Sequence, residues 1–262
     1  MTETPYYLRF SGVARLYGHD ALETLRKTHI CVVGIGGVGS WSAEALARSG
    51  VGEITLIDMD EICITNTNRQ IHTTIETLGK SKVLTMMQRI KSINPECQVN
   101  AIEDFFTNSS AEEILKNKFD GVIDAIDSLN SKCELLYRCL RAKIPLVSVG
   151  GAGGKTDPTK IQTCDLLKTY KDPLLSQVRK RLRQKYNFSR NPKRRFRIEV
   201  VFSPEELVYP AKDGSVCSSK PKMDSGDSLR LDCSAGYGAI THITATFGMV
   251  AAASMIKKAL KS

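Results

Sequence analysis

Residues 29–40, HICVVGIGGVGS, decide the fold of this chain. A short apolar run leads into Gly34, Gly36 and Gly39, which have the spacing G-x-G-x-x-G, and apolar residues at helical spacing follow over residues 41–49. A strand, a glycine turn and a helix suit a phosphate, because glycine lets the backbone approach it closely and the helix N-terminus offers free N–H groups. On its own the motif fits a mononucleotide fold, a dinucleotide fold or a tight turn without a ligand.

An acidic residue after the next strand favours a nucleotide. Residues 53–57 form the second apolar run, and Asp58 follows it directly. An acidic side chain roughly 20 residues beyond such glycines can bind the hydroxyls of a ribose. A strand-end cap is the structural alternative for Asp58.

Strands and helices alternate through the first part of the chain. Further strands are expected at 98–102, 121–123 and 146–149, and helices at 80–93, 111–117 and 130–142. This alternation predicts an α/β fold with a doubly wound, mostly parallel Rossmann-like sheet. Residues 124–127, DAID, follow one of the strands, so acidic groups are expected at the same sheet edge as the glycine turn.

The alternation weakens after residue 155, which predicts two parts. Residues 1–155 are expected to form an ATP-binding domain with an N-terminal arm, and residues 156–262 a smaller α+β extension. The extension is expected to contain a strand at 160–166, a basic helix at 174–186, a strand at 198–203, a mobile polar linker at 203–230 and a terminal helix within 235–260. Residues 239–256 carry no full charge, but His242 and several hydroxyl residues favour a buried helix over a membrane span.

Composition indicates an ordinary globular protein. Of the 262 residues, 42% are hydrophobic and 25% are charged, and the N-terminus lacks the pattern of a signal peptide. The eight cysteines include no C-x-x-C pair, which argues against a disulfide framework or a structural zinc site. A cytoplasmic location is therefore expected.

The positive charge is concentrated in one stretch. The net charge is +9, and residues 179–197 contain ten lysines and arginines without an acidic residue. Such a stretch indicates a polyanionic partner, here tRNA, although a solvated helix face is the alternative. The candidate tRNA-binding residues are Arg179, Lys180, Arg183, Lys193, Arg194, Arg195 and Arg197. Arg179, Lys180 and Arg183 are expected to face outward, and Tyr186, Phe188 and Phe196 are expected to stack on an unpaired base.

Five motifs in order resemble the ubiquitin-activating-like adenylating superfamily. They are GIGGVG at 34–39, DMD at 58–60, NTNRQ at 66–70, GKSK at 79–82 and DAIDS at 124–128. The resemblance implies ATP and Mg²⁺ as cofactors, with Asp58 on the ribose and Asp127 beside the magnesium and the α-phosphate. The residues that it implies for ATP binding are Gly34, Gly36, Gly37, Gly39, Asp58, Asp60, Asn66 and Gln70, and those for catalysis are Arg69, Lys82, Asp127 and Arg15.

Over nearly its whole length the chain resembles one branch of that superfamily, the tRNA threonylcarbamoyladenosine dehydratases. The motifs are RFSGVARLYG at 9–18, GGAGGK at 150–155, the basic stretch, LDCSAGYG at 231–238 and ATFG at 245–248. The resemblance implies that ATP activates the threonyl carboxylate of threonylcarbamoyladenosine beside the tRNA anticodon, and that the adenylate then cyclises. It also implies a homodimer that exchanges an N-terminal arginine, for which Arg15 or Arg9 is available.

Two other functions stay open. The first is adenylation of the C-terminal glycine of a ubiquitin-like sulfur carrier, and the missing zinc motifs argue against it. The second is a nicotinamide-dependent oxidoreductase, and the cationic loop at 66–70 argues against it. Cys233 has no basic neighbour in sequence to activate its thiol, so we expect it to be dispensable. The alternative is a sulfur-accepting thiol with a cysteine desulfurase or another sulfur-transfer protein as its partner.

Overall fold

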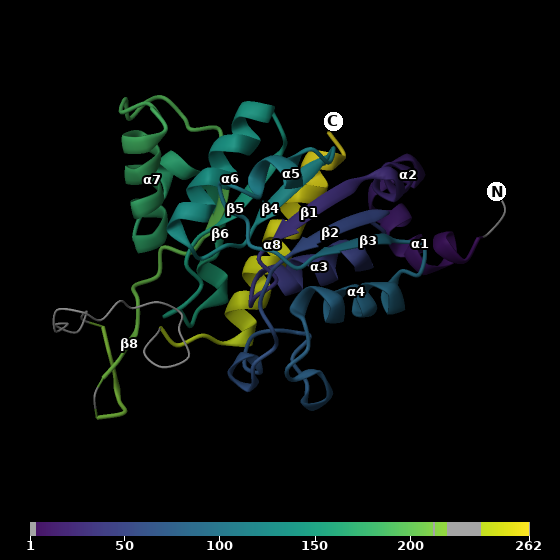
Figure 1. Cartoon of the computed structure of the whole chain (residues 1–262), viewed down its shortest axis with the longest axis horizontal. Helices are drawn as coiled ribbons and strands as arrows, with labels where there is room; N and C mark the ends of the chain where they lie inside the picture. The colour runs from purple at the N-terminus through teal and green to yellow at the C-terminus, as the bar shows by residue number, and fades with distance from the viewer. Residues whose placement is uncertain (1–3, 212, 219–236, 262) are drawn as a thin grey trace.

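A seven-stranded sheet forms the centre of the computed structural model, which describes residues 4–211, 213–218 and 237–261. The strand order is β3-β2-β1-β4-β5-β7-β6, and each neighbouring pair is parallel except β6 with β7. The strands are β1 His29–Val33, β2 Glu53–Ile57, β3 Gln98–Ile102, β4 Gly121–Asp124, β5 Leu146–Val149, β6 Gln162–Asp165 and β7 Glu199–Phe202. The expected doubly wound α/β fold is confirmed (Figure 1).

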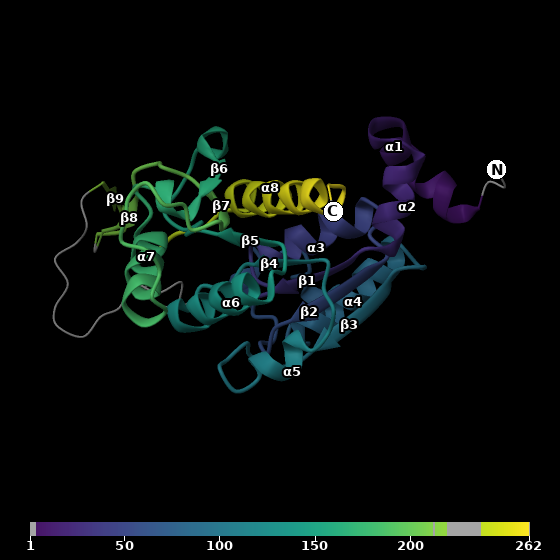
Figure 2. The same cartoon turned by 90° about the horizontal axis from the view of Figure 1, so that it is seen from above.

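Helices cover both faces of the sheet. Alternate residues along the strands point to opposite faces, so Val32 belongs to the apolar cluster that includes α3, α4 and α8, whereas Val33 belongs to the one that includes α5, α6 and α7. The helices are α1 Pro5–Tyr17, α2 His19–Lys27, α3 Gly39–Arg48, α4 Lys82–Ile93, α5 Ala111–Leu115, α6 Leu129–Ala142, α7 Pro173–Lys185 and α8 Thr241–Ala259. Figure 2 shows α8 and α6 on opposite sides of the sheet.

The terminal helix α8 is a buried helix, as expected. Ile243, Phe247 and Met255 are 0% exposed, and α8 packs against α3 and the strands β4, β5 and β7. Gly248 permits the close approach to α3, because a Cβ there would lie 2.6 Å from the carbonyl oxygen of Val38. Among the described residues, none of the helices is long and apolar enough to span a membrane.

The elements of the second part join the same sheet and core. β6 and β7 extend the sheet beyond β5, and α8 fills the face beside α3. The division at residue 155 therefore remains a prediction about how the sequence is organised. The expected strand at 160–166 is shorter and runs antiparallel, and the linker at 203–230 includes a hairpin of β8 Tyr209–Pro210 and β9 Val216–Cys217. Residues 219–230 of that linker lie outside the described residues.

Candidate active site

A cavity of about 610 Å³ lies at the carboxyl ends of β1, β2, β4 and β5. In a parallel sheet this edge is where ligands bind. The cavity brings together ten residues singled out from the sequence: Gly34, Gly36, Gly37, Asp58, Asp60, Asn66, Arg69, Gln70, Lys82 and Asp127. The motifs at 34–39, 58–60, 66–70, 79–82 and 124–128 thus meet in space although 94 positions separate Gly34 from Ser128.

The glycines of the turn have different physical roles. Gly34 has φ +88, and a Cβ there would lie 2.8 Å from the carbonyl oxygen of Ala125. Gly39 lets the start of α3 pack on the turn, since its Cβ would lie 1.8 Å from the carbonyl oxygen of Gly34. Gly36 and Gly37 line the cavity, whereas Gly39 does not. Gly39 therefore shapes the turn, and Gly36 and Gly37 leave room for the ligand.

Asp58 holds the glycine turn in place from the end of β2. Its Oδ2 accepts a hydrogen bond from the backbone N–H of Ile35 at 2.6 Å, and its Oδ1 accepts one from the N–H of Asp60 at 2.9 Å. Burial raises the pKa of Asp58, and the ammonium of Lys82 and the two N–H groups oppose that rise. The capping role is thus present, and the same carboxylate also lines the cavity.

Lys82 supplies a positive charge to the cavity from the first residue of α4. Its Nζ lies 2.6 Å from Oδ2 of Asp60 and 3.9 Å from Oδ1 of Asp58, and the residue is 6% exposed. A largely buried ammonium between two carboxylates is held in a defined position. Asp60 is exposed, so this ion pair lies at the open side of the cavity wall.

The loop at 66–70 is fixed from three directions. Asn66 accepts the backbone N–H of Cys63 at 2.9 Å, and the indole of Trp41 on α3 donates to the carbonyl oxygen of Arg69 at 3.0 Å. Thr244 on α8 donates to the same carbonyl at 3.3 Å. The guanidinium of Arg69 donates to the carbonyl oxygen of Thr65 at 2.7 Å, so the cation is held above its own loop at the cavity wall.

The two aspartates of the DAID motif have different environments. Asp124 is completely buried, and its Oδ2 lies 2.6 Å from Nζ of Lys132 and accepts the hydroxyl of Ser148 at 2.5 Å. Asp127 is exposed and lines the cavity. Asp124 is therefore a structural residue, and Asp127 is available to a ligand.

Several lining residues were not anticipated. They are the loop at 104–107, Ser131 on α6, Leu174 on α7 and Thr244 on α8, with Ala239 just before that helix. The two aromatic residues of the loop, Phe105 and Phe106, come soon after β3, and that position was the available signal. Leu174 and Thr244 reach the cavity only through the packing of distant helices, which local sequence does not reveal.

Comparison with known proteins agrees with this geometry. The family model described as the ThiF family matches residues 10–262. The chain belongs to the ThiF family. A relative in Escherichia coli, named tRNA threonylcarbamoyladenosine dehydratase, is 51% identical over 95% of this chain and 92% of its own length.

A solved structure of an E. coli tRNA N6-threonylcarbamoyladenosine dehydratase in complex with ATP is similar throughout. It has a TM-score of 0.88 and 46% identity, and the match covers 100% of this chain and 97% of that one. The molybdopterin-synthase adenylyltransferase of Escherichia coli is a more distant relative, 29% identical over 52% of this chain and 54% of its own length.

The structure describes Arg15 but not Cys233, and Arg15 does not line the cavity. Arg15 is exposed on α1 of this ThiF-family chain and is absent from the residues that line the cavity. Cys233 lies outside the described residues, so the structure does not test its role.

The basic stretch of this ThiF-family chain is only partly exposed. Lys180, Lys193, Arg194, Arg195 and Arg197 are exposed. The expectation that Arg179 faces outward is wrong, because this half-buried guanidinium hydrogen-bonds to the hydroxyl of Thr169, and burial lowers its pKa. Arg183 is also partly covered, since its guanidinium lies 5.4 Å from the centre of the Phe196 ring.

The aromatic residues of this stretch belong to the fold. Phe196 is 3% exposed and packs on Phe188, with their ring centres 5.1 Å apart. Tyr186 donates its hydroxyl to Oε2 of Glu134 on α6 at 2.7 Å. The expectation that Phe196 stacks on a base is therefore wrong, because its ring is already buried against the protein.

Proposed function

We propose that this chain is an ATP-dependent tRNA threonylcarbamoyladenosine dehydratase. The observation that supports it most directly is the set of adenylating motifs that meet in one cavity, in a chain similar to such dehydratases over nearly its whole length. The enzyme joins the threonyl carboxylate to the α-phosphate of ATP and then closes a ring. Because the substrate is tRNA, we place the reaction in the cytoplasm.

The chemistry explains why a carboxylate needs ATP. A carboxylate oxygen attacks the α-phosphorus and pyrophosphate leaves, which gives a mixed anhydride of the acid and AMP. A heteroatom of the neighbouring carbamoyl group then attacks the acyl carbon, loses its proton, and expels AMP together with the former carboxylate oxygen. Ring closure within one molecule is fast when the ends are held together, so a protein thiol is not required. This agrees with a dispensable Cys233.

The charges of the cavity suit the transfer to phosphorus. The attack brings an anionic oxygen toward anionic phosphate, and cations beside these oxygens lower the free energy of the transition state. Arg69 and Lys82 provide those cations, with Lys82 moving from Asp60 to the phosphates. We propose that Asp127 holds Mg²⁺ together with the phosphates, because this metal is commonly bound by one or two carboxylates plus substrate oxygens.

We further propose that a homodimer completes the site with Arg15. The arginine does not line the cavity of its own chain, so it would have to act on a neighbouring copy. Its neighbours Leu16 and Tyr17 are 74% and 54% exposed, which leaves apolar surface available beside it. Light scattering coupled to size exclusion should give twice the mass of the chain.

Exchange of pyrophosphate into ATP tests the function. We expect exchange, and release of AMP, with tRNA that carries threonylcarbamoyladenosine and not with tRNA that lacks it. The competing function would show the opposite dependence: exchange stimulated by a ubiquitin-like carrier with a C-terminal glycine and indifferent to modified tRNA. That result would show that the proposed substrate is wrong.

A further inference from the structure

The carboxylate of Asp172 joins two segments that lie far apart in sequence. Asp172 is 3% exposed, and its Oδ1 accepts the backbone N–H of Leu175, which caps the N-terminus of α7. Its Oδ2 accepts the backbone N–H of Gly151 at 3.0 Å. Gly151 lies in the loop after β5, which lines the cavity, so one buried side chain fixes both the start of α7 and a cavity wall.

The loop is shaped to receive this carboxylate. A Cβ on Gly150 would lie 2.2 Å from Oδ2 of Asp172, so any side chain there would displace it. Leu174, two residues after Asp172, lines the same cavity. The wall at this end therefore consists of the loop and the first turn of α7, and Asp172 lies between them.

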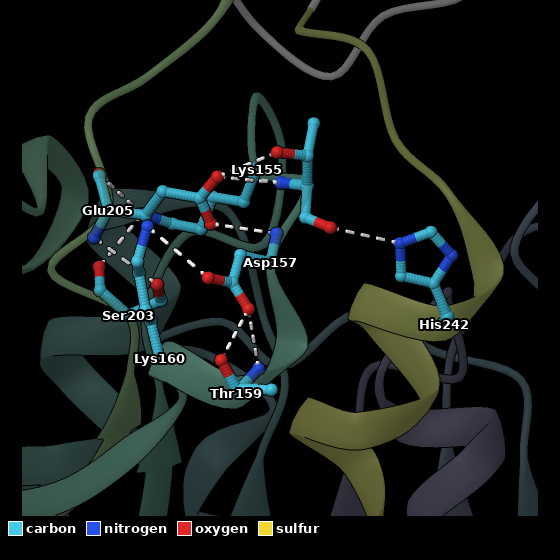
Figure 3. Close-up of polar contacts among 8 residues, drawn as sticks. Lys155, Asp157, Thr159, Lys160, Ser203, Glu205 and His242 are labelled. Atoms are coloured by element: carbon cyan, nitrogen blue, oxygen red, sulfur yellow. Dashed lines mark hydrogen bonds and ion pairs between the residues drawn. The ribbon is translucent and has the colours of Figure 1, made fainter.

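Positively charged side chains near Asp172 favour its ionised form. Lys155 at the end of the same loop is 3% exposed, and its Nζ donates to the carbonyl oxygen of Ser203 at 2.8 Å, as Figure 3 shows. Burial raises the pKa of Asp172, while the Leu175 and Gly151 N–H groups and the charges of Lys155 and Lys132 favour its ionised form. Asp172 thus stays in a polar environment that holds it in one place.

The order of the strands distinguishes two ends of the cavity. Across β2, β1, β4 and β5, the lining residues run from Asp58 through the glycine turn and Asp127 to Gly150–Gly153. If Asp58 binds the ribose and Asp127 lies by the α-phosphate, the nucleotide occupies the β2 end. The group that attacks the α-phosphate must then approach from the β5 end.

We propose that Asp172 is a positioning residue for the acyl substrate: it fixes the β5 wall against which the threonylcarbamoyl group lies, and it leaves the nucleotide end unaffected. This inference rests on the proposed function. A positioning role for Asp172 predicts that its loss lowers the efficiency with modified tRNA and leaves ATP affinity unchanged. A purely structural residue would affect both alike.

Asp172→Asn is the informative variant. Asparagine caps a helix as well as aspartate does, so α7 keeps its cap while the N–H of Gly151 loses its acceptor. We expect kcat/KM for modified tRNA to fall about tenfold, as for the loss of one buried hydrogen bond of ~1.4 kcal/mol, with the Kd for ATP changed less than about twofold. Gly150→Ala approaches the same contact from the loop, so it should shift the same parameter, and the double variant should be less than additive.

Asp157→Asn is the matched control. Asp157 also caps a short helix, since its Oδ1 accepts the N–H of Thr159 at 3.0 Å (Figure 3). It is not among the residues that line the cavity. We expect wild-type kinetics from it. Amide hydrogen exchange should be faster in residues 150–153 of Asp172→Asn and unchanged in this control.

The outcomes separate the inference from the proposed function. If the wild type releases AMP with modified tRNA while Asp172→Asn behaves like it, or loses ATP affinity to the same extent as tRNA efficiency, the positioning role is wrong. If the wild type releases no AMP with modified tRNA, the proposed function is wrong and so is an acyl-substrate role for Asp172. Amide exchange then still shows whether Asp172 fixes the wall.

Discussion

At the scale of single residues, environment decides function more than residue type does. Asp124 and Asp127 lie three positions apart at the end of one strand, yet the first is 0% exposed beside Lys132 and the second faces the cavity. A buried carboxylate keeps its charge only if a partner compensates it.

Replacing Asp127 and replacing Asp124 should affect different properties. Asp127→Ala should lower turnover by two to three decades, roughly the effect of a single electrostatic stabiliser, with unfolding unchanged. Asp124→Ala leaves Lys132 buried without its partner, so it should lower the free energy of unfolding by about 3–5 kcal/mol. Steady-state kinetics and urea unfolding of both variants measure this. Near-normal turnover of Asp127→Ala at saturating magnesium would contradict its role.

Asp58 should contribute to ATP affinity. Asp58→Ala removes the acceptor that we propose for the ribose hydroxyls, together with the observed acceptor for the N–H groups of Ile35 and Asp60. A loss of roughly 1.5–3 kcal/mol in binding free energy is expected for hydrogen bonds to a charged acceptor. Isothermal titration calorimetry with ATP measures it, and NADH serves as the control ligand. Tight NADH binding without ATP binding would favour the oxidoreductase instead.

His72 should make the protein less stable in mild acid. It is 2% exposed, neither ring nitrogen has a hydrogen-bond partner among the described residues, and burial, with the charges of Lys82 and Arg89, lowers its pKa to about 4. Between pH 6.5 and 4 the unfolded chain binds more protons at this site, so stability falls as the pH drops. The full effect is about 3 kcal/mol, at ~1.4 kcal/mol per pKa unit.

Comparison with a neutral variant isolates this contribution. His72→Gln should flatten the pH dependence between pH 6.5 and 4, whereas His19→Gln, which removes an exposed imidazole from α2, should not. Burial raises the pKa of Asp58 and Asp172, which acts in the opposite sense but equally in all three proteins. Urea unfolding at several pH values gives the profiles. An unchanged profile for His72→Gln would contradict the assignment.

At the scale of elements, the local sequence pattern predicted the bounds of strands better than it predicted which side chains are exposed. The expected ranges 53–57, 98–102 and 146–149 match β2, β3 and β5, because short apolar runs bounded by polar residues have few other solutions in an α/β fold. The expected helix at 80–93 begins two residues later, where Ser81 caps α4. The sequence also predicted that the motif residues lie near the glycine turn, since each motif is a short run of residues of a particular chemical type.

What the sequence could not reveal depends on tertiary packing. Thr244 lies 210 positions after Gly34 and reaches the cavity because α8 packs on α3. Lys132 and Leu136 on α6 are both 0% exposed, and the ion pair of Lys132 with Asp124 forms only because α6 packs on the sheet. In the basic stretch, charge alone did not show that Arg179 turns toward Thr169. Exposure depends on neighbours that are distant in sequence.

The exposed part of the basic stretch should bind tRNA through its phosphates. Reversal of Arg194 and Arg195 to Glu should weaken tRNA binding and flatten the log–log salt slope by roughly one unit per lost contact. ATP affinity should stay unchanged, because neither residue lines the cavity. Filter binding at several salt concentrations measures the slope. Reversal of Lys27 and Lys91, also exposed, changes the net charge equally and is the control.

At the scale of the whole molecule, one chain brings together all the proposed ATP-site residues that line the cavity, and Arg15 is not among them. The cavity lies at the carboxyl ends of β1, β2, β4 and β5, and α8 also lines it. Because α8 packs in the same core as these strands, the second part of the sequence contributes to the ATP site. Arg15 lies on α1, which together with α2 forms a separate small cluster around Tyr6 and Phe10. An arginine in this position can serve the site only across a symmetric interface.

Mixing two inactive variants tests this arrangement. Arg15→Ala keeps Asp127 but cannot donate the arginine, and Asp127→Ala keeps the arginine but has no functional cavity. In a mixed dimer the cavity of the Arg15→Ala chain receives Arg15 from its partner, so one of its two sites is restored. Random pairing at equal concentrations makes half of the dimers mixed, and about a quarter of wild-type activity should return. Mixing after mild denaturation and refolding, with each variant alone as control, measures the recovery. If the protein is monomeric or Arg15 acts within its own chain, the mixture stays as inactive as its components.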